Sequence, residues 1–296
     1  MRAYLPAYEL ISPASLNDAL DTLAREPGDW RPFAGGTDLM VLLESGKLPH
    51  TNYLNIWQLP ELRGIEVTDA HLTMGALTTY TDVQASAVLQ KEFPMLCQAA
   101  RETGGLAIQN RGTLGGNIIN ASPAADSPPA LLAYDAELEL VSNTGSRWLP
   151  YQGFHTGYKR MLIRPNELLT RIRLPRTALE PLELRGLQHY YRKIGTRKAQ
   201  AISKVCIAAT ARMNGAQIID LHLALGSVAP IPIRCVATES ALRNQRLDRT
   251  AIEKGKQELA KEIAPIDDIR STRDYRLRVS LNLLEDFLLR LERQGV

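Results

Sequence analysis

The sequence predicts a mixed α+β fold, with a larger N-terminal domain followed by a smaller C-terminal domain. Its 296 residues suit about two domains of roughly 150 residues each. Strand-like runs alternate along the chain with segments of helical apolar spacing, and a stretch rich in proline and charge between Pro175 and Leu187 separates two halves. We therefore expect domains at residues 1–176 and 177–296, the first with subdomains at about 1–56 and 57–176.

Composition and charge exclude several classes of protein. Hydrophobic residues make up 45% of the chain and charged residues 23%, and no apolar run is long enough to cross a bilayer. A formal net charge of +3 is too weak to indicate nucleic-acid binding. The first residues lack the apolar core of a signal peptide, so we expect a cytoplasmic protein.

The cysteines and histidines do not form a recognisable metal site. Cys97, Cys206 and Cys235 lie far apart and form no C-x-x-C pair, and the five histidines form no H-E-x-x-H. We expect no metal ligands and no disulfide framework, and interpret the cysteines as buried thiols.

The predicted elements of the first subdomain begin with a capped helix. Ser15 precedes an apolar face that starts at Leu16 and ends near Gly28. A short strand at residues 30–33 follows, and a second helix starts near Leu39. The glycine-rich loop at residues 33–39 should therefore connect a strand to a helix, where free N–H groups and the helix dipole favour an anion.

The second subdomain and the C-terminal domain are also mixed. Strands are predicted at residues 53–56, 64–67, 72–75 and 136–140, and a helix at residues 93–100. A second glycine-rich segment, predicted as a loop, occupies residues 113–117. Further on, Asn214-Gly215 between apolar runs at 205–213 and 217–225 predicts a β-hairpin, and a helix covers residues 275–291.

The two glycine-rich segments carry the chemical prediction. Paired glycines let the backbone approach a phosphate and turn its N–H groups toward it. Two such segments in one domain suggest an extended ligand with polar groups along its length. Alternatives stay open, because a Gly-Gly pair can be an ordinary turn, and both Asp38 and Asp126 could simply cap a helix or sit in a turn.

Taken together, these motifs resemble those of the FAD-binding subunits of molybdenum hydroxylases, such as the medium subunits of xanthine and carbon monoxide dehydrogenases. The resemblance rests on A-G-G-T-D at residues 34–38, N-R-G-T-L-G-G-N at 110–117 and A-S-P-A-A-D at 121–126. It extends to P-N-E-L-L at 165–169 and P-I-D-D-I-R-S-T at 265–272. It implies an FAD-binding domain with two α+β subdomains, followed by a smaller α+β domain.

The resemblance also assigns residues to the cofactor. The first loop would wrap the FAD pyrophosphate, the second would lie beside the ribityl and phosphate region, and a lysine would approach the flavin. Asp38 would orient its loop, and a leucine would pack on the ring, although it could equally be core. The implied positions are Arg31, Pro32, Phe33, Ala34, Gly35, Gly36, Thr37, Asp38, Leu39, Thr113, Leu114, Gly115, Gly116, Asn117, Asp126, Leu169 and Lys193.

One segment departs from the family pattern. Many relatives carry an aspartate shortly after the lysine, where this chain has Gln200-Ala201. The loss would leave Arg197 and Lys198 without an obvious partner. A solvated basic loop is the alternative interpretation of this cluster.

The implied function is electron transfer, without catalytic side chains of the chain's own. Flavin can exchange electrons singly or in pairs. The subunit would take electrons from [2Fe-2S] clusters on a small subunit, after oxidation of substrate at a molybdenum cofactor on a large subunit. The acceptor would be NAD⁺, oxygen or a quinone. Two alternatives stay open, a self-sufficient FAD oxidoreductase and a scaffold whose flavin site has decayed.

Overall fold

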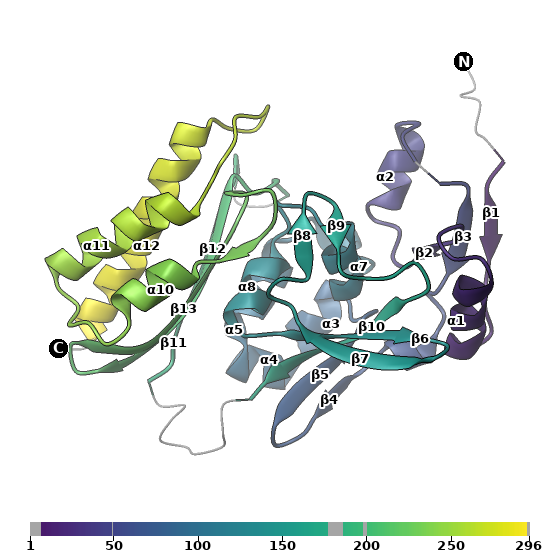
Figure 1. The fold of residues 1–296 in the computed structure, drawn as a ribbon, viewed down its shortest axis with the longest axis horizontal. Helices are drawn as coiled ribbons and strands as arrows, with labels where there is room; N and C mark the ends of the chain where they lie inside the picture. The colour runs from purple at the N-terminus through teal and green to yellow at the C-terminus, as the bar shows by residue number, and fades with distance from the viewer. Residues whose placement is uncertain (1–6, 49, 177–185, 198–199, 295–296) are drawn as a thin grey trace.

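The computed structural model describes residues 7–48, 50–176, 186–197 and 200–294, and the chain passes through three main sheets in turn, with a small two-stranded sheet besides (Figure 1). The N-terminal sheet and the C-terminal sheet lie at opposite ends of the long axis. A group of helices and a five-stranded sheet lie between them (Figure 1). The expected domain boundary after residue 176 falls beside residues 177–185, which lie outside the described residues.

The N-terminal unit is a small parallel sheet with two helices. Its strands, in the order β1-β3-β2, all run parallel. Ser15 caps the first helix by accepting a hydrogen bond from the Asp18 N–H, as the sequence predicts. The elements are β1 (Glu9–Ile11), α1 (Leu16–Arg25), β2 (Arg31–Phe33), α2 (Leu39–Glu44) and β3 (Asn52–Asn55).

The central unit combines an antiparallel sheet with a helical layer. The sheet has the order β4-β5-β10-β6-β7, and a separate two-stranded hairpin pairs β8 with β9. Its strands are β4 (Ile65–Val67), β5 (His71–Gly75), β6 (Glu137–Ser142), β7 (Gly145–Pro150), β8 (His155–Gly157), β9 (Arg160–Met161) and β10 (Leu168–Pro175). Its helices are η1 (Pro60–Leu62), α3 (Tyr80–Ala85), α4 (Ala87–Glu92), α5 (Pro94–Glu102), α6 (Leu106–Gln109), α7 (Leu114–Asn120) and α8 (Ser127–Ala133).

The second glycine-rich segment is helical, so the prediction of a loop at residues 113–117 was wrong. The Thr113 hydroxyl accepts the Gly116 N–H at 3.0 Å and starts α7, which therefore contains both glycines of the pair. A threonine N-cap outweighs the low helix propensity of two glycines at a helix start, where few intrahelical hydrogen bonds are at stake.

The C-terminal unit is an antiparallel sheet buried on both faces. Val205, Ile207 and Ala209 pack toward the C-terminal helices, whereas Cys206 and Ala208 pack toward the central unit. This alternation explains why the β12 sequence is continuously apolar. The elements are β11 (Gln188–Ile194), β12 (Val205–Asn214), β13 (Gln217–Gly226), β14 (Ile233–Arg234), α10 (Val236–Leu242), α11 (Arg249–Glu262) and α12 (Arg273–Gln294).

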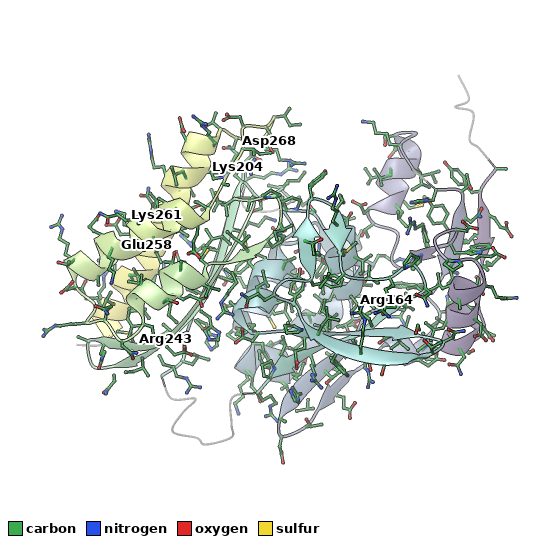
Figure 2. All side chains as sticks on the ribbon, viewed as in Figure 1. Arg164, Lys204, Arg243, Glu258, Lys261 and Asp268 are labelled. Atoms are coloured by element: carbon green, nitrogen blue, oxygen red, sulfur yellow. The ribbon has the colours of Figure 1, made fainter. Side chains whose placement is uncertain are left out.

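The predicted hairpin is confirmed, with a shifted turn. Asn214 pairs with Gln217, so the central turn residues are Gly215 and Ala216, and Gly215 adopts φ +56°. The hairpin spans the C-terminal unit, with Lys204 near one end and Arg243 near the other (Figure 2). Lys193 on β11 pairs with Cys206 and so lies near the Lys204 end.

All three cysteines are buried and unpaired, as the sequence predicts. Within the described ranges, no helix is long and apolar enough to cross a membrane.

Candidate functional site

The first glycine-rich loop connects β2 to α2, as predicted, and its backbone donors are free. Gly36 adopts φ +77°, a conformation that favours glycine. In the described part of the chain, the N–H groups of Gly35, Gly36 and Thr37 donate no hydrogen bond to another protein group. Consecutive unbonded N–H groups at a turn form a concavity suited to an anion.

This loop touches the segment that leads into α7. A Cβ added to Gly35 would lie 1.7 Å from the Arg111 carbonyl oxygen, so no other residue fits there. Arg111 Nε also donates to the Gly35 carbonyl, at 3.3 Å. The first predicted FAD-binding segment therefore contacts Arg111, 76 residues away and just before the second predicted segment.

A second link joins the loop to the end of α7. Asn120 Nδ2 donates to Asp38 Oδ1 at 3.1 Å, and Lys159 Nζ donates to Asn120 Oδ1 at 2.7 Å. Asp38 stands at the N-cap position of α2 without making a capping hydrogen bond. The donor to its carboxylate is a side-chain amide instead of the expected backbone or ribose, and the role of Asp38 in orienting the loop stays a prediction.

The two glycines of α7 have different environments. A Cβ at Gly115 would lie 2.7 Å from both the Cβ and the carbonyl oxygen of Ala76, so this glycine lets α7 pack closely against the segment that contains Ala76. Gly116 is exposed, and a Cβ there would meet only the Thr113 hydroxyl. Asn117 Oδ1 accepts the Ser127 hydroxyl at 2.5 Å. Gly116 is thus the glycine of the pair that an outside ligand can approach.

Asp126 and Lys193 form a buried ion pair between the central unit and the C-terminal sheet. Asp126 Oδ2 lies 2.6 Å from Lys193 Nζ, and the side chains are 9% and 5% exposed. Lys193 Nζ also donates to the Glu102 carbonyl at 2.8 Å. Burial raises the pKa of Asp126 to about 6, opposed by the lysine charge. Asp126 Oδ1 is buried without a partner among the described residues.

The remaining predicted positions are divided between core and surface. Leu169 is only 3% exposed and belongs to the central core, in agreement with the core interpretation, so its contact with a flavin ring stays a prediction. Arg197 donates to the Gln200 carbonyl from Nε at 3.1 Å and Nη2 at 2.6 Å. The expectation that Arg197 lacks a partner was therefore wrong, because a backbone carbonyl replaces the missing acid. Lys198 lies outside the described residues.

Sequence reasoning missed an aromatic contact beside the first loop. The guanidinium of Arg111 lies over the Trp57 ring, 3.9 Å from its centroid, and that of Arg63 lies over it at 4.5 Å. Arg111 belongs to the N-R-G-T-L-G-G-N motif at residues 110–117. Its partner Trp57 lies 54 residues earlier, and no spacing rule connects the two. The Asn120 and Lys159 contacts gave no sequence signal either, because they depend on the tertiary fold.

No group of three or more His, Cys, Asp or Glu side chains could hold a metal ion within the ranges that the structure describes. The site instead fits FAD by its donor set. The free loop N–H groups suit a diphosphate, and the outward-facing Gly116 leaves room for it. The unpaired buried oxygen of Asp126 offers an acceptor to a ring N–H or a hydroxyl.

Comparison with known families identifies two matching domains. Residues 6–177 match the FAD binding domain in molybdopterin dehydrogenase, and residues 189–291 match the CO dehydrogenase flavoprotein C-terminal domain. The chain belongs to this family of FAD-binding subunits of molybdenum hydroxylases, so it is an oxidoreductase subunit with FAD as its cofactor.

Individual relatives cover nearly the whole chain. It is 35% identical to the putative xanthine dehydrogenase FAD-binding subunit XdhB of Escherichia coli K12, over 90% of this chain and 89% of that one. It is 28% identical to the carbon monoxide dehydrogenase medium chain of Hydrogenophaga pseudoflava, over 92% of each. A solved structure of carbon monoxide dehydrogenase from that organism, 26% identical, superposes with a TM-score of 0.91 over 99% of both chains.

Proposed function

We propose that this chain transfers electrons within a molybdenum hydroxylase complex, taking them from [2Fe-2S] clusters of a small subunit and delivering them to NAD⁺, oxygen or a quinone. The observation that carries the proposal is the contact between the first glycine loop, whose N–H groups are free, and the segment that leads into α7 with its exposed Gly116. Bound FAD supplies the exchange between one-electron and two-electron chemistry.

The chain's own residues bind and orient the cofactor in this proposal. The N–H groups of residues 35–37 bind the pyrophosphate, and Thr113 and Asn117 lie along the ribityl and phosphate region. Asp126 and Lys193 fix a buried pair of charges toward the C-terminal sheet. Such preorganised charges tune a bound ring without reorganising during the reaction.

The relatives support a proposal for the partners. Their names describe FAD-binding subunits or medium chains of xanthine, carbon monoxide and glyceraldehyde dehydrogenases. We propose an iron–sulfur small subunit and a molybdenum-cofactor large subunit as partners, in a heterotrimeric cytoplasmic unit. Co-purification of the three tagged chains and fractionation of the cells test these assignments. We also propose that the two domains comprise residues 1–176 and 177–296.

The variant Gly36→Val tests the electron-transfer role in the assembled complex. Valine cannot adopt φ +77° without strain, and its Cβ would lie 2.8 Å from the Phe33 ring, so the loop must change shape. We expect the variant complex to lose FAD and at least about 100-fold of its turnover with the natural acceptor, a barrier change of about 2.7 kcal/mol.

Reduction of ferricyanide, an artificial one-electron acceptor, serves as the internal control. It should continue in the variant, because the iron–sulfur subunit can still reduce it. A variant complex that keeps FAD, or that lacks FAD but still reduces the natural acceptor at the wild-type rate, would contradict the proposal.

A further inference from the structure

Arg111 occupies the point where the two FAD-binding segments meet. Its carbonyl oxygen lies against Gly35, its Nε donates to the Gly35 carbonyl, and its guanidinium lies over Trp57. One residue therefore contacts the first loop through both its backbone and its side chain. The indole holds the guanidinium in a fixed plane while Nε stays available to the loop.

The first loop has few other means of support. The helix that follows it, α2, contains no buried residue, and its Met40 and Val41 are 52% and 61% exposed. The loop is thus not held by a hydrophobic core on that side. Its position relative to α7 depends on polar contacts, namely Arg111 with Gly35 and Asn120 with Asp38.

Charge near the loop points to an anion. Neither Arg111 nor Arg63 forms an ion pair with a carboxylate in the described part of the chain, although both guanidinium groups lie over the same indole ring. Two cations held near each other repel, and neither is neutralised by an ion pair, so positive charge stays beside the loop, whose own carboxylate, Asp38, accepts from Asn120. A diphosphate bound to the neighbouring N–H groups would be attracted by it.

We infer that Arg111 is a positioning residue for FAD, which holds the first glycine loop at the spacing that the pyrophosphate requires and keeps positive charge beside it. The inference rests on the proposed assignment of residues 35–37 to the pyrophosphate. It goes beyond that assignment by identifying the side chain that joins the two segments. Arg63 shares the ring but donates to the Trp57 carbonyl instead of the loop.

The matched pair Arg111→Lys and Arg63→Lys tests this inference. Both keep the charge and remove a planar guanidinium from the same indole, but only Arg111→Lys loses the Gly35 contact. The full chain is stripped of FAD, and FAD binding is titrated by the change in flavin fluorescence at two salt concentrations. We expect the Kd to rise about tenfold for Arg111→Lys, the loss of one charge-assisted hydrogen bond, and less than about twofold for Arg63→Lys.

A third variant separates position from charge. Arg111→Gln removes the charge as well, so its Kd should rise further and depend less on salt. The urea midpoint of the stripped chain should stay unchanged in all three variants. Equal Kd values for the two lysine variants, or wild-type binding by Arg111→Lys, would overturn the positioning role. Wild-type FAD binding by Gly36→Val would instead reject the proposed pyrophosphate site itself.

Discussion

The two junctions of the central unit differ in how they are built. Toward the N-terminal sheet, the contacts at the glycine loop are polar and exposed, from Arg111 with Gly35 to Asn120 with Asp38. Toward the C-terminal sheet, the core is continuous, because Tyr191, Cys206 and Ala208 join the same cluster as the central helices. One ion pair at that junction, Asp126 with Lys193, is almost fully buried.

The two junctions therefore differ in function: one can admit a ligand, and the other holds fixed charges. An open polar junction can admit a dinucleotide and close on it with little loss of buried apolar area. At the packed junction, fixed charges act at a low dielectric and so reach further. We expect the first junction to govern FAD affinity and the second to govern stability and the electrostatic setting of the bound ring.

Removing one member of the buried pair should have the largest effect on stability. Lys193→Met leaves the Asp126 carboxyl buried without its cation, which typically costs about 3–5 kcal/mol. The double variant Asp126→Asn/Lys193→Met should recover most of that loss, because neither charge remains. Urea unfolding of the single and double variants measures the coupling. Additive losses would show that the two charges do not depend on each other.

The raised pKa of the Asp126 carboxyl should make the protein less stable as the pH rises. Because burial raises the pKa of Asp126 to about 6, its contribution is greatest when the carboxyl is protonated, below about pH 4, and is lost as the pH rises through 6. The free energy of unfolding of the wild type relative to Asp126→Asn should fall by up to about 3 kcal/mol over that range.

His189, which lies against Tyr134 at the same junction, provides the control with the opposite sign. Burial lowers the pKa of His189 to about 4, so its contribution is present above about pH 6.5 and is lost as the pH falls toward 4. Relative to His189→Gln, the wild type should therefore lose stability on acidification. The same sign for both residues would contradict the assigned shifts.

Substitutions in the glycine pair of α7 should have the smallest effects on stability. They should also separate the packing role of Gly115 from the ligand-facing role of Gly116. Gly115→Ala places a methyl 2.7 Å from Ala76 and should cost about 1–3 kcal/mol by overpacking. Gly116→Ala should change the free energy of unfolding by less than about 1 kcal/mol, since a better helix former offsets crowding at the Thr113 cap. Thermal melts of the two stripped chains measure the difference.

Local rules predicted most elements, but they missed two short-range contacts. The Ser15 cap, the strand–loop–helix around Gly36 and the hairpin at Gly215 follow from short-range patterns. The helical state of residues 114–117 was missed because two glycines concealed the Thr113 cap. The partner of Arg197 was missed because a backbone carbonyl leaves no trace in the sequence.

At the candidate site, the motifs could be read from the sequence, but the long-range contacts could not. The motifs identified the close approaches of Gly35 to Arg111 and of Gly115 to Ala76, because glycine is required where a backbone approaches closely. They could not show that Asp126 and Lys193 pair with each other, since the two lie 67 residues apart. Nor could they show that Trp57 orders Arg111, a contact that only the folded chain creates.

The most direct test of FAD binding between the two glycine-bearing segments is the flavin content of the purified chain and of its Gly116→Ala variant. Visible absorption gives the bound flavin, and chromatography after denaturation identifies it. We expect about one FAD per wild-type chain and a colourless but equally folded variant, because the added methyl projects from the exposed face of α7. A Gly116→Ala chain that retains FAD with wild-type affinity would contradict the placement of the cofactor between these two segments.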